Sequence, residues 1–543
     1  MSLFADEHLL FSPAHPIEDA ISLIFAFPST YKVGITSLGY QVVWATLASR
    51  TDLAVGRLFT DAQDSLPSQP ELVGFSVSWE LDYINILDLL DGLKVPLRSS
   101  HRSAADPIVF GGGPVLTANP EPFADFFDVI LLGDGELLLT DFIDAYRSVR
   151  KGDRHTQLCH LANVPGVYVP SLYQPIYTDP NGLFSSIAPI TPDIPDYVTK
   201  QTYRGNTLST STVVTDKAAW ESIYMVEVVR SCPEMCRFCL ASYLTLPFRT
   251  VSVEESLIPA IDRGLTVTDR IGLLGASVTQ HPEFDTLLDY LNCPQYDHVR
   301  LSLASVRTNT VTAKLVQTLV KHDTQSITIA VESGSERVRQ IVNKKLNTDD
   351  IVVAATRAKA GGLKALKLYG MVGIPGESMD DVEQTVALMY ALKKQVPGLK
   401  LTLGCSTFVP KAHTPFQWHG VKSDSNRRLN FLQKQLRSRG IDFRPESYKW
   451  SVIQALISRG DRRLSLIFEK VRQYGHSLGS YRRAFKDLKH QLPPLDFYVH
   501  EQWSRQQPLP WGHLHGPLPI QTLLKHLDTA ESHMSSQLTV KHE

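Results

Sequence analysis

The chain has 543 residues, which is enough for about three domains, and its composition is that of an ordinary globular protein. Lysine and arginine (54) nearly balance aspartate and glutamate (56), so no overall charge selects a nucleic acid or a membrane as partner. The first residues lack the basic region of a signal peptide, and no apolar run reaches the roughly 18 residues of a membrane span. We therefore expect a cytoplasmic protein that has no membrane partner.

Short apolar runs alternate with helical patterns in residues 1–152. The runs that predict strands are residues 21–28, 54–59, 72–77 and 107–110. Strands that alternate with helices indicate a parallel α/β sheet, here a Rossmann-like domain, whose ligands lie beyond the carboxyl ends of the strands. The fourth run continues into Gly111, Gly112 and Gly113. These glycines either let a ligand approach the backbone closely or form a tight turn.

Residues 153–219 are rich in proline, threonine and tyrosine, which predicts a linker. Residues 220–418 then repeat strand and helix six times, which predicts a partial (β/α)₆ barrel. The predicted strands are residues 224–230, 270–274, 299–303, 326–331, 363–372 and 400–408. Residues 419–528 are mainly helical in pattern, and residues 529–543 are polar and predict a disordered tail. In a barrel of this kind, active residues gather at the carboxyl ends of the strands.

Three cysteines follow the first barrel strand directly. Cys232, Cys236 and Cys239 have the spacing C-x₃-C-x₂-C. Cysteine thiolates hold iron–sulfur clusters, usually four at a time, so three would leave one iron open to another ligand. A structural zinc site or buried free thiols are the alternatives, although zinc needs a fourth ligand.

This loop resembles the cluster loop of the radical S-adenosylmethionine (radical SAM) superfamily. In that family the open iron binds SAM, and electron transfer splits SAM into methionine and a 5′-deoxyadenosyl radical. From about residue 27 to residue 513, the chain is similar to a branch that has a methylthiotransferase-type core and an N-terminal cobalamin-binding-type domain. Gly111–Gly113 and the run Gly133-Asp134-Gly135-Glu136 carry the second part of the likeness. The resemblance implies a [4Fe–4S] cluster, SAM and an external electron donor such as flavodoxin or ferredoxin.

The resemblance also implies a set of cofactor-binding residues at the strand ends. They are Phe238, Gly275, Ala276, Glu332, Arg339, Gly373 and Ile374. Glu332 would accept hydrogen bonds from SAM or its ribose, and Arg339 would pair with the SAM carboxylate unless it is a solvated helix charge. Gly275 and Ala276 occupy the position of the family's Gly-Gly-Glu, so backbone groups would serve there. Gly373 would let adenine lie against the backbone, with Phe238 packed beside it.

Cobalamin is the cofactor that the sequence leaves open. The Asp-x-His-x-x-Gly signature that supplies a cobalt ligand does not occur, and the corresponding loop, residues 30–39, has no histidine. Either the domain binds a corrin without this ligand, with Gly111–Gly113 at the site, or it kept the fold and lost the corrin.

Two further features concern the substrate. Lys411 and His413 follow the last barrel strand, where they would either move protons or shape the loop. Residues 421–490 hold 17 lysines and arginines against six aspartates and glutamates, interspersed with aromatic residues. This basic segment would either bind RNA or form a helical cap on the acidic N-terminal domain.

We therefore expect a radical SAM enzyme that modifies an unactivated C–H centre, with methyl transfer if cobalamin binds. An RNA-modifying enzyme without cobalamin and a non-catalytic cluster-containing binding protein are the alternatives.

Overall fold

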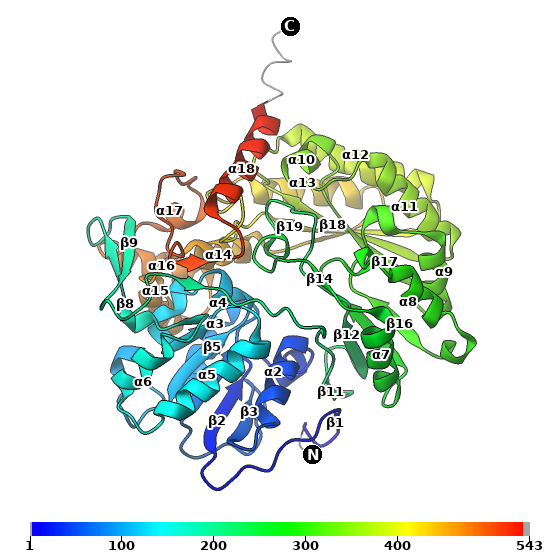
Figure 1. Ribbon diagram of the computed structural model, residues 1–543. Helices are drawn as coiled ribbons and strands as arrows, with labels where there is room; N and C mark the ends of the chain where they lie inside the picture. Colours follow the sequence, from blue (N-terminus) through cyan, green and yellow to red (C-terminus); the bar gives the residue numbers. More distant parts are fainter. Residues whose placement is uncertain (1–2, 536–543) are drawn as a thin grey trace.

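The computed structural model describes residues 3–535 (Figure 1). The N-terminal domain is a six-stranded sheet of order β3-β2-β4-β5-β6-β7, in which only β7 is antiparallel. The strands are β2 (Ile21–Ala26), β3 (Leu53–Leu58), β4 (Leu72–Ser76), β5 (Ile108–Gly112), β6 (Val129–Leu131) and β7 (Val167–Tyr168). The main helices are α2 (Leu38–Ala48), α3 (Tyr83–Gly92), α5 (Gly135–Val149) and α6 (Arg154–Leu161). All four strands expected from the apolar runs are present.

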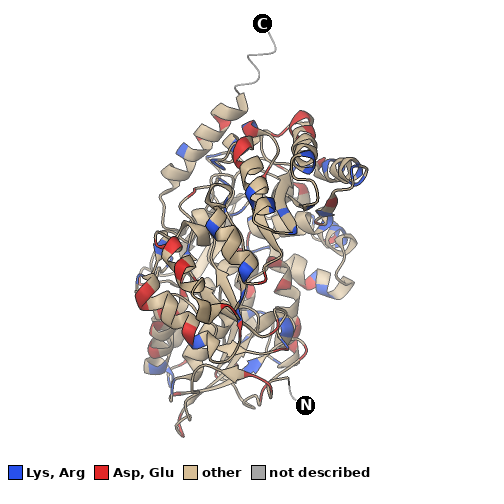
Figure 2. Cartoon of the chain, turned by 90° about the vertical axis from the view of Figure 1, so that its right-hand side faces the viewer, with Lys and Arg blue, Asp and Glu red and all other residues tan. Residues whose placement is uncertain are grey.

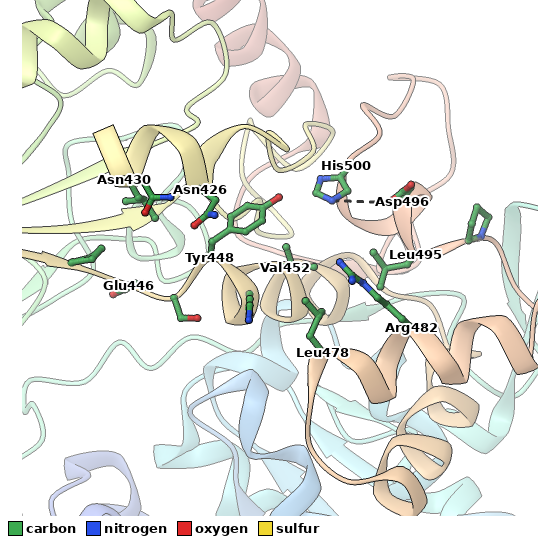
Figure 3. A pocket seen from close by; sticks show the side chains of 15 residues that line it. Asn426, Asn430, Glu446, Tyr448, Val452, Leu478, Arg482, Leu495, Asp496 and His500 are labelled. Carbon is green, nitrogen blue, oxygen red and sulfur yellow. Dashed lines mark ion pairs between the residues drawn. The ribbon is translucent and has the colours of Figure 1, made fainter. Parts of the chain in front are cut away.

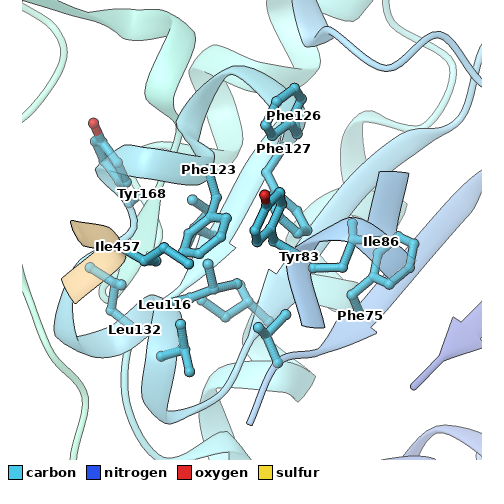
Figure 4. Close-up of a cluster of buried hydrophobic side chains, with 14 of the residues drawn as sticks. Phe75, Tyr83, Ile86, Leu116, Phe123, Phe126, Phe127, Leu132, Tyr168 and Ile457 are labelled. Atoms are coloured by element: carbon cyan, nitrogen blue, oxygen red, sulfur yellow. The ribbon is translucent and has the colours of Figure 1, made fainter. Parts of the chain in front are cut away.

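The strands of this domain are buried almost throughout, because side chains cover both faces of the sheet. Figure 4 shows one such cluster, where Phe75, Tyr83, Phe123 and Phe127 pack together. Ile457 joins the cluster from helix α14 (Tyr448–Arg459), more than 300 residues further along the chain. The C-terminal region therefore completes the core of the N-terminal domain.

The expected linker contains regular structure at both of its ends. Strand β7 belongs to the first sheet, so that domain extends past residue 152, and β8 (Tyr173–Tyr177) and β9 (Phe184–Pro189) form a hairpin. Further along, β10 (Val198–Thr199) pairs with β21 (Leu514–His515) near the end of the chain. The linker is thereby attached to both terminal regions.

The six expected strands of the core are all present. They are β12 (Ile223–Glu227), β15 (Arg270–Leu274), β16 (Arg300–Leu303), β17 (Ser326–Glu332), β18 (Ala365–Val372) and β19 (Lys400–Thr407). They form two parallel sheets, β12-β15-β16 and β17-β18-β19-β20, where β20 (Asp442–Pro445) is an addition from the C-terminal region. In the described part of the chain the sheets are linked only by a bridge between Val306 and Ile329. Helices α7 (Ile258–Leu265), α8 (Phe284–Leu291), α9 (Ala313–Lys321), α11 (Thr348–Ala360) and α12 (Met379–Gln395) cover the outer face.

The C-terminal region is helical, as expected. After α13 (Ser425–Arg437) and α14 come α15 (Leu464–Tyr474), α16 (Leu478–Asp487), α17 (Leu495–Val499) and α18 (Ile520–Ser535). Helix α18 includes residues 529–535, which corrects part of the expected disordered tail, and residues 536–543 lie outside the described residues. Among residues 3–535, no helix is long and apolar enough to cross a membrane.

Candidate functional site

The three cysteines lie at the carboxyl end of β12 and line one cavity of about 190 Å³. The walls of this cavity also include the loops that follow β15 and β16 and the end of β17. Within residues 3–535, no three His, Cys, Asp or Glu side chains converge as ligands of a metal ion. The fold therefore brings Cys232, Cys236 and Cys239 to one cavity but not to one point.

The loop that carries the cysteines is clamped by the turn after helix α10 (Glu336–Ile341). The Arg237 guanidinium donates to the carbonyls of Gln340 (2.8 Å) and Ile341 (2.6 Å), and so closes the carboxyl end of this helix. The Asn343 amide donates to the carbonyls of Glu234 (3.1 Å) and Met235 (2.9 Å). The Cys236 thiol also contacts the Asn343 carbonyl (3.8 Å), so side chains of the cysteine loop and of this turn hold the loop in place together.

The backbone around the cavity is strained. Nine described residues other than glycine have positive φ, and five of them surround the cysteines: Ser231, Met235, Glu332, Asn343 and Lys345. Such conformations are costly, and they cluster at functional sites where the surrounding structure enforces them.

Two ion pairs place charge in the cavity. Lys344 Nζ lies 2.7 Å from Glu332 Oε1. Burial opposes the charge on Lys344, but Glu332 and Cys236 beside it hold its pKa above the ordinary value. Arg307, in the loop after β16, lies 3.3 Å from Glu234 in the cysteine loop, and its buried Nε has no hydrogen-bond partner among the described residues. The cavity thus offers a carboxylate and two cations to an incoming ligand.

The thiols themselves are desolvated. Burial raises the pKa of Cys236 to about 12, and it also raises the pKa of Cys239. Thiolates in such a place need a bound cation to stabilise them, which is what metal ligation supplies. The donor set therefore fits an iron–sulfur cluster.

The structure separates the expected SAM contacts into two groups. Phe238, Ala276 and Glu332 line the cysteine cavity, whereas Gly275, Arg339, Gly373 and Ile374 do not. Gly275 has φ +146°, and a Cβ there would lie 2.5 Å from the Val229 carbonyl oxygen. The Gly373 N–H donates to Glu377 Oε2 (2.6 Å), and Ile374 is fully buried. These positions shape the strand ends.

Arg339 is buried away from the cavity. Its guanidinium donates to the carbonyls of Ser333 (2.8 Å) and Leu346 (3.1 Å) and to Thr348 Oγ1 (2.8 Å). These bonds attach α10 to the segments on either side of it. The guanidinium is therefore engaged within the fold, and Arg307 is the arginine that reaches the cavity.

Lys411 and His413 also lie outside the cysteine cavity. Lys411 Nζ contacts Glu80 Oε1 and lies 3.2 Å from Ser458 Oγ, so it joins the core to both other regions. His413 lines a different cavity, together with Trp511. Burial lowers the pKa of His413 to about 4, which keeps its imidazole neutral near pH 7. This geometry matches the alternative in which both residues shape the loop.

A second cavity, of about 240 Å³, lies at the carboxyl edge of the N-terminal sheet. Gly112 and Gly113 line it, whereas Gly111 packs against Phe127 and Leu116. Gly113 has φ +114° and meets the Val77 carbonyl, so a turn explains it. At Gly112 a Cβ would meet nothing closer than 3.7 Å, so this glycine leaves the cavity open. No histidine is among the described residues that line it.

Arg230 connects the two cavities. It lines the N-terminal cavity and stands two residues before Cys232. Its guanidinium pairs with Glu136 (2.6 Å) and Glu227 (2.7 Å), one from each domain. The carboxyl edge of the first sheet therefore faces the cysteine loop.

Many arginines of the basic segment are engaged inside the molecule. Arg462 pairs with Glu121 (3.1 Å), and Arg472 pairs with Asp88 (2.7 Å), both on the N-terminal domain. A cavity of about 630 Å³ in this region is lined by Arg482, which has no ion pair within residues 3–535, but acidic side chains also line it (Figure 3). Figure 2 shows cations and acids interspersed on the core side of the molecule. These contacts fit the helical cap rather than a free basic face.

Sequence reasoning missed Arg307 and Lys344. Arg307 had a usable signal, because it comes four residues after the end of strand β16. Lys344 had none, since it lies in a turn after a helix and reaches Glu332 only through the fold.

Comparisons with known proteins agree with this arrangement. Residues 39–170 match the family described as "Radical SAM proteins, N-terminal", and residues 226–389 match the "Radical SAM superfamily". An uncharacterized protein of Methanocaldococcus jannaschii is 27% identical over 443 residues, which cover 81% of this chain and 88% of that protein. A tRNA-2-methylthio-N(6)-dimethylallyladenosine synthase of Neorickettsia sennetsu is 26% identical over 238 residues, and the match covers 41% of this chain and about half (49%) of that protein.

Among solved structures, the radical S-adenosylmethionine methyltransferase TsrM from Kitasatospora setae, with cobalamin and a [4Fe-4S] cluster bound, aligns with a TM-score of 0.47 at 13% identity. The alignment covers 74% of this chain and 77% of that one. The matched core domain contains the cysteine loop and the strand ends described above. The chain is an enzyme of the radical SAM superfamily.

Proposed function

We propose that this enzyme reductively cleaves SAM at a [4Fe–4S] cluster held by Cys232, Cys236 and Cys239, and uses the radical to modify an unactivated C–H centre. The observation that carries the proposal is the shared cavity, in which the three cysteines meet a carboxylate and two cations at the strand ends. When bound, the reduced cluster would supply the electron that breaks a carbon–sulfur bond of SAM. An external donor such as flavodoxin or ferredoxin would restore that electron.

Different residues of the cysteine cavity would bind different parts of SAM. The Glu332 carboxylate can accept hydrogen bonds from two ribose hydroxyls while Lys344 holds it in place. Arg307 has a buried Nε without a partner, and a guanidinium binds a carboxylate through two parallel hydrogen bonds. Glu332 and Lys344 are buried and the Arg307 side chain is 14% exposed, so bound SAM would have little contact with water here.

Methyl transfer with cobalamin is the reaction type that the second cavity favours. That cavity has apolar walls and an open glycine, and it lies beside the cysteine loop through Arg230. Its lining fits a corrin whose lower face has no protein histidine.

The first test is anaerobic reconstitution of the protein with iron and sulfide. We expect about four irons per chain and slow formation of 5′-deoxyadenosine from SAM under a strong reductant. Replacing Cys232, Cys236 and Cys239 together with alanine should remove both. Arg307→Ala should weaken SAM binding by about 1.5–3 kcal/mol, the range for a hydrogen bond to a charged group.

Arg339→Ala provides the matched comparison for Arg307→Ala. Because Arg339 is hydrogen-bonded within the fold, its loss should lower thermal stability more than SAM affinity. The proposal fails if the triple cysteine variant keeps its iron, or if an intact cluster gives no cleavage of SAM.

The second test is cobalamin binding. Hydroxocobalamin should bind with a base-off spectrum and no histidine ligation. Gly112→Leu fills the cavity without backbone strain and should weaken binding at least tenfold, while Gly92→Leu on helix α3, which meets open space, should not. Histidine-ligated cobalt would contradict the ligation, and no binding by the parent protein would remove the corrin and with it the preference for methyl transfer.

A further inference from the structure

The inner face of the core sheets carries a large cavity that the SAM site does not use. Its volume is about 700 Å³, and residues of β12, β15, β16, β17 and β18 line it. Successive side chains of a strand point to opposite faces, so Ile327 and Ile329 pack against the outer helices while Ser326 and Thr328 face this cavity. Small and polar side chains leave the inner face open.

This inner cavity adjoins the cysteine cavity. On β17, Thr328 lines the inner cavity, and Ala330, the next residue on the same face, lines the cysteine cavity. The loop after β16 repeats the pattern, with Ala304 on the inner cavity and Ser305 on the cysteine cavity. A ligand in the inner cavity would therefore extend toward the cysteines.

The inner cavity is cationic at the end remote from the cysteines. Arg270 and Arg300 are register partners on β15 and β16, so their side chains share a face, and Lys367 lies level with Thr328 on β17. Among the lining residues, the one acid is Asp323. Arg300 is 61% exposed and lies 3.8 Å from Asp269, and Lys367 has no ion pair or hydrogen bond within the described residues. Arg270 also donates to the Glu221 carbonyl (2.6 Å), so Lys367 is the unengaged cation among the described lining residues, and Arg270 and Arg300 add positive charge on the same face.

An aromatic residue stands between the cations and the cysteines. Tyr369 follows Lys367 on the same face of β18 and is 55% exposed, which is unusual for a large ring in the middle of a strand. Its register partner is Ala330, which lines the cysteine cavity. Its ring packs against Gly404, where a Cβ would lie 2.8 Å from it. Tyr369 thus stands on the inner face between the residues that line the two cavities, and Trp220, 51% exposed, lines the inner cavity itself.

We propose that this inner face binds the substrate and that the substrate is a nucleotide unit. The inference rests on the proposed function for its chemistry. Phosphate lies against Lys367, Arg270 and Arg300, and the base stacks on Tyr369, which places it level with the cysteine cavity. Cations that bind phosphate beside an aromatic ring that stacks a base form the usual arrangement for a nucleotide.

The test measures binding of two probes to the reconstituted full-length protein. The probes are AMP and a fluorescein-labelled single-stranded 12-nucleotide RNA. Lys367→Ala should weaken binding about tenfold and lower the salt dependence of RNA binding by about one phosphate contact. Tyr369→Ala should weaken binding about fivefold or more, and Tyr369→Phe should restore it. Arg482→Ala, in the basic segment, is the matched control and should bind as the parent does.

The two probes separate the two sources of this chemistry. Binding of AMP as tight as that of RNA indicates a free nucleotide, whereas tighter and more salt-dependent binding of RNA indicates a nucleotide within a strand, and both support the site. The inference is overturned if neither probe binds at 1 mM AMP or about 0.1 mM RNA, or if Lys367→Ala and Tyr369→Ala bind like the parent. If the parent protein binds nucleotide but does not cleave SAM, that result would instead count against the proposed function.

Discussion

The N-terminal sheet and the core sheets of this chain differ in how many of their faces are buried. In the N-terminal sheet, β4 and β5 are buried over nearly all of their residues, because both faces are covered. In the core, β18 alternates buried and exposed positions along its whole length, because helices cover one face only. The same chain thus contains one sheet that is closed on both faces and one that stays open on its inner face.

The difference bears on where ligands can bind. A sheet covered on both faces offers a ligand only its carboxyl edge, and the glycine-lined cavity of the N-terminal domain lies there. The core offers its carboxyl ends, where the cysteines lie, and also the inner face that leads to them. The first sheet therefore has a cavity at one edge, while the second has one at its carboxyl ends and another on its inner face.

The C-terminal helices form much of the layer that covers the second face of the N-terminal sheet. The Tyr83 ring stacks on Phe468 of α15 with 4.0 Å between centroids, and the Tyr83 and Tyr481 hydroxyls are 2.5 Å apart. Arg98 pairs with Glu469 (2.7 Å) at the same interface. The basic segment is therefore part of the folded N-terminal unit.

The largest expected effect comes from breaking this interface at Arg462. Its guanidinium pairs with the buried Glu121 and donates to Tyr168 Oη (2.7 Å) and to the carbonyls of Pro170 (3.0 Å) and Tyr173 (2.9 Å). Arg462→Ala leaves the Glu121 carboxylate buried without its arginine partner, although the Tyr168 hydroxyl still donates to it, and this loss costs about 3–5 kcal/mol. Hydrogen exchange should show protection of β2, β4 and β5 falling about 100-fold or more, with the core strands unchanged.

Arg482→Ala is the control for that measurement. Arg482 has no ion pair or hydrogen bond within residues 3–535, so its loss should change stability by no more than about 0.5 kcal/mol. If Arg462→Ala lowers protection equally in the N-terminal sheet and in the core, the molecule unfolds as one unit. The two regions would then not differ in stability as we expect.

Much of the fold could be predicted from the sequence, because hydrophobic period and turn residues are local signals. The six core strands and four N-terminal strands were expected within a few residues of where they lie. Strand β20 was missed, because it is short and pairs with β19 from beyond the expected core. The pairing of β10 with β21 joins residues more than 300 positions apart, and no local pattern announces it.

The candidate site was predictable only where the chain places its residues together. Cys232, Cys236 and Cys239 are close in sequence, so their spacing alone brought them to one cavity. Lys344 and Arg307 reach that cavity from two other segments, and charge on a helix or loop does not reveal which way it faces. Arg339 is the opposite case. The resemblance implied that it binds SAM, but its guanidinium donates to main-chain carbonyls within the fold.

The smallest expected effect is the pH dependence that His513 gives to the covered N-terminal unit. His513 is buried 3.7 Å from Glu121, and burial lowers its pKa from 6.5 to about 4, although that carboxylate opposes the shift. The unfolded chain therefore binds more protons than the folded chain below pH 6.5, so this contribution is present above pH 6.5 and is lost as the pH falls toward 4. His513→Gln should remove about 1 kcal/mol of the stability lost between pH 6.5 and 5.5, measured by thermal unfolding at each pH.

His413 and His419, whose pKa values burial also lowers to about 4, should leave part of the pH dependence of stability in this variant. The exposed His515 is the control, and a His513→Gln curve parallel to that of His515→Gln and the parent would show that His513 does not titrate in this window.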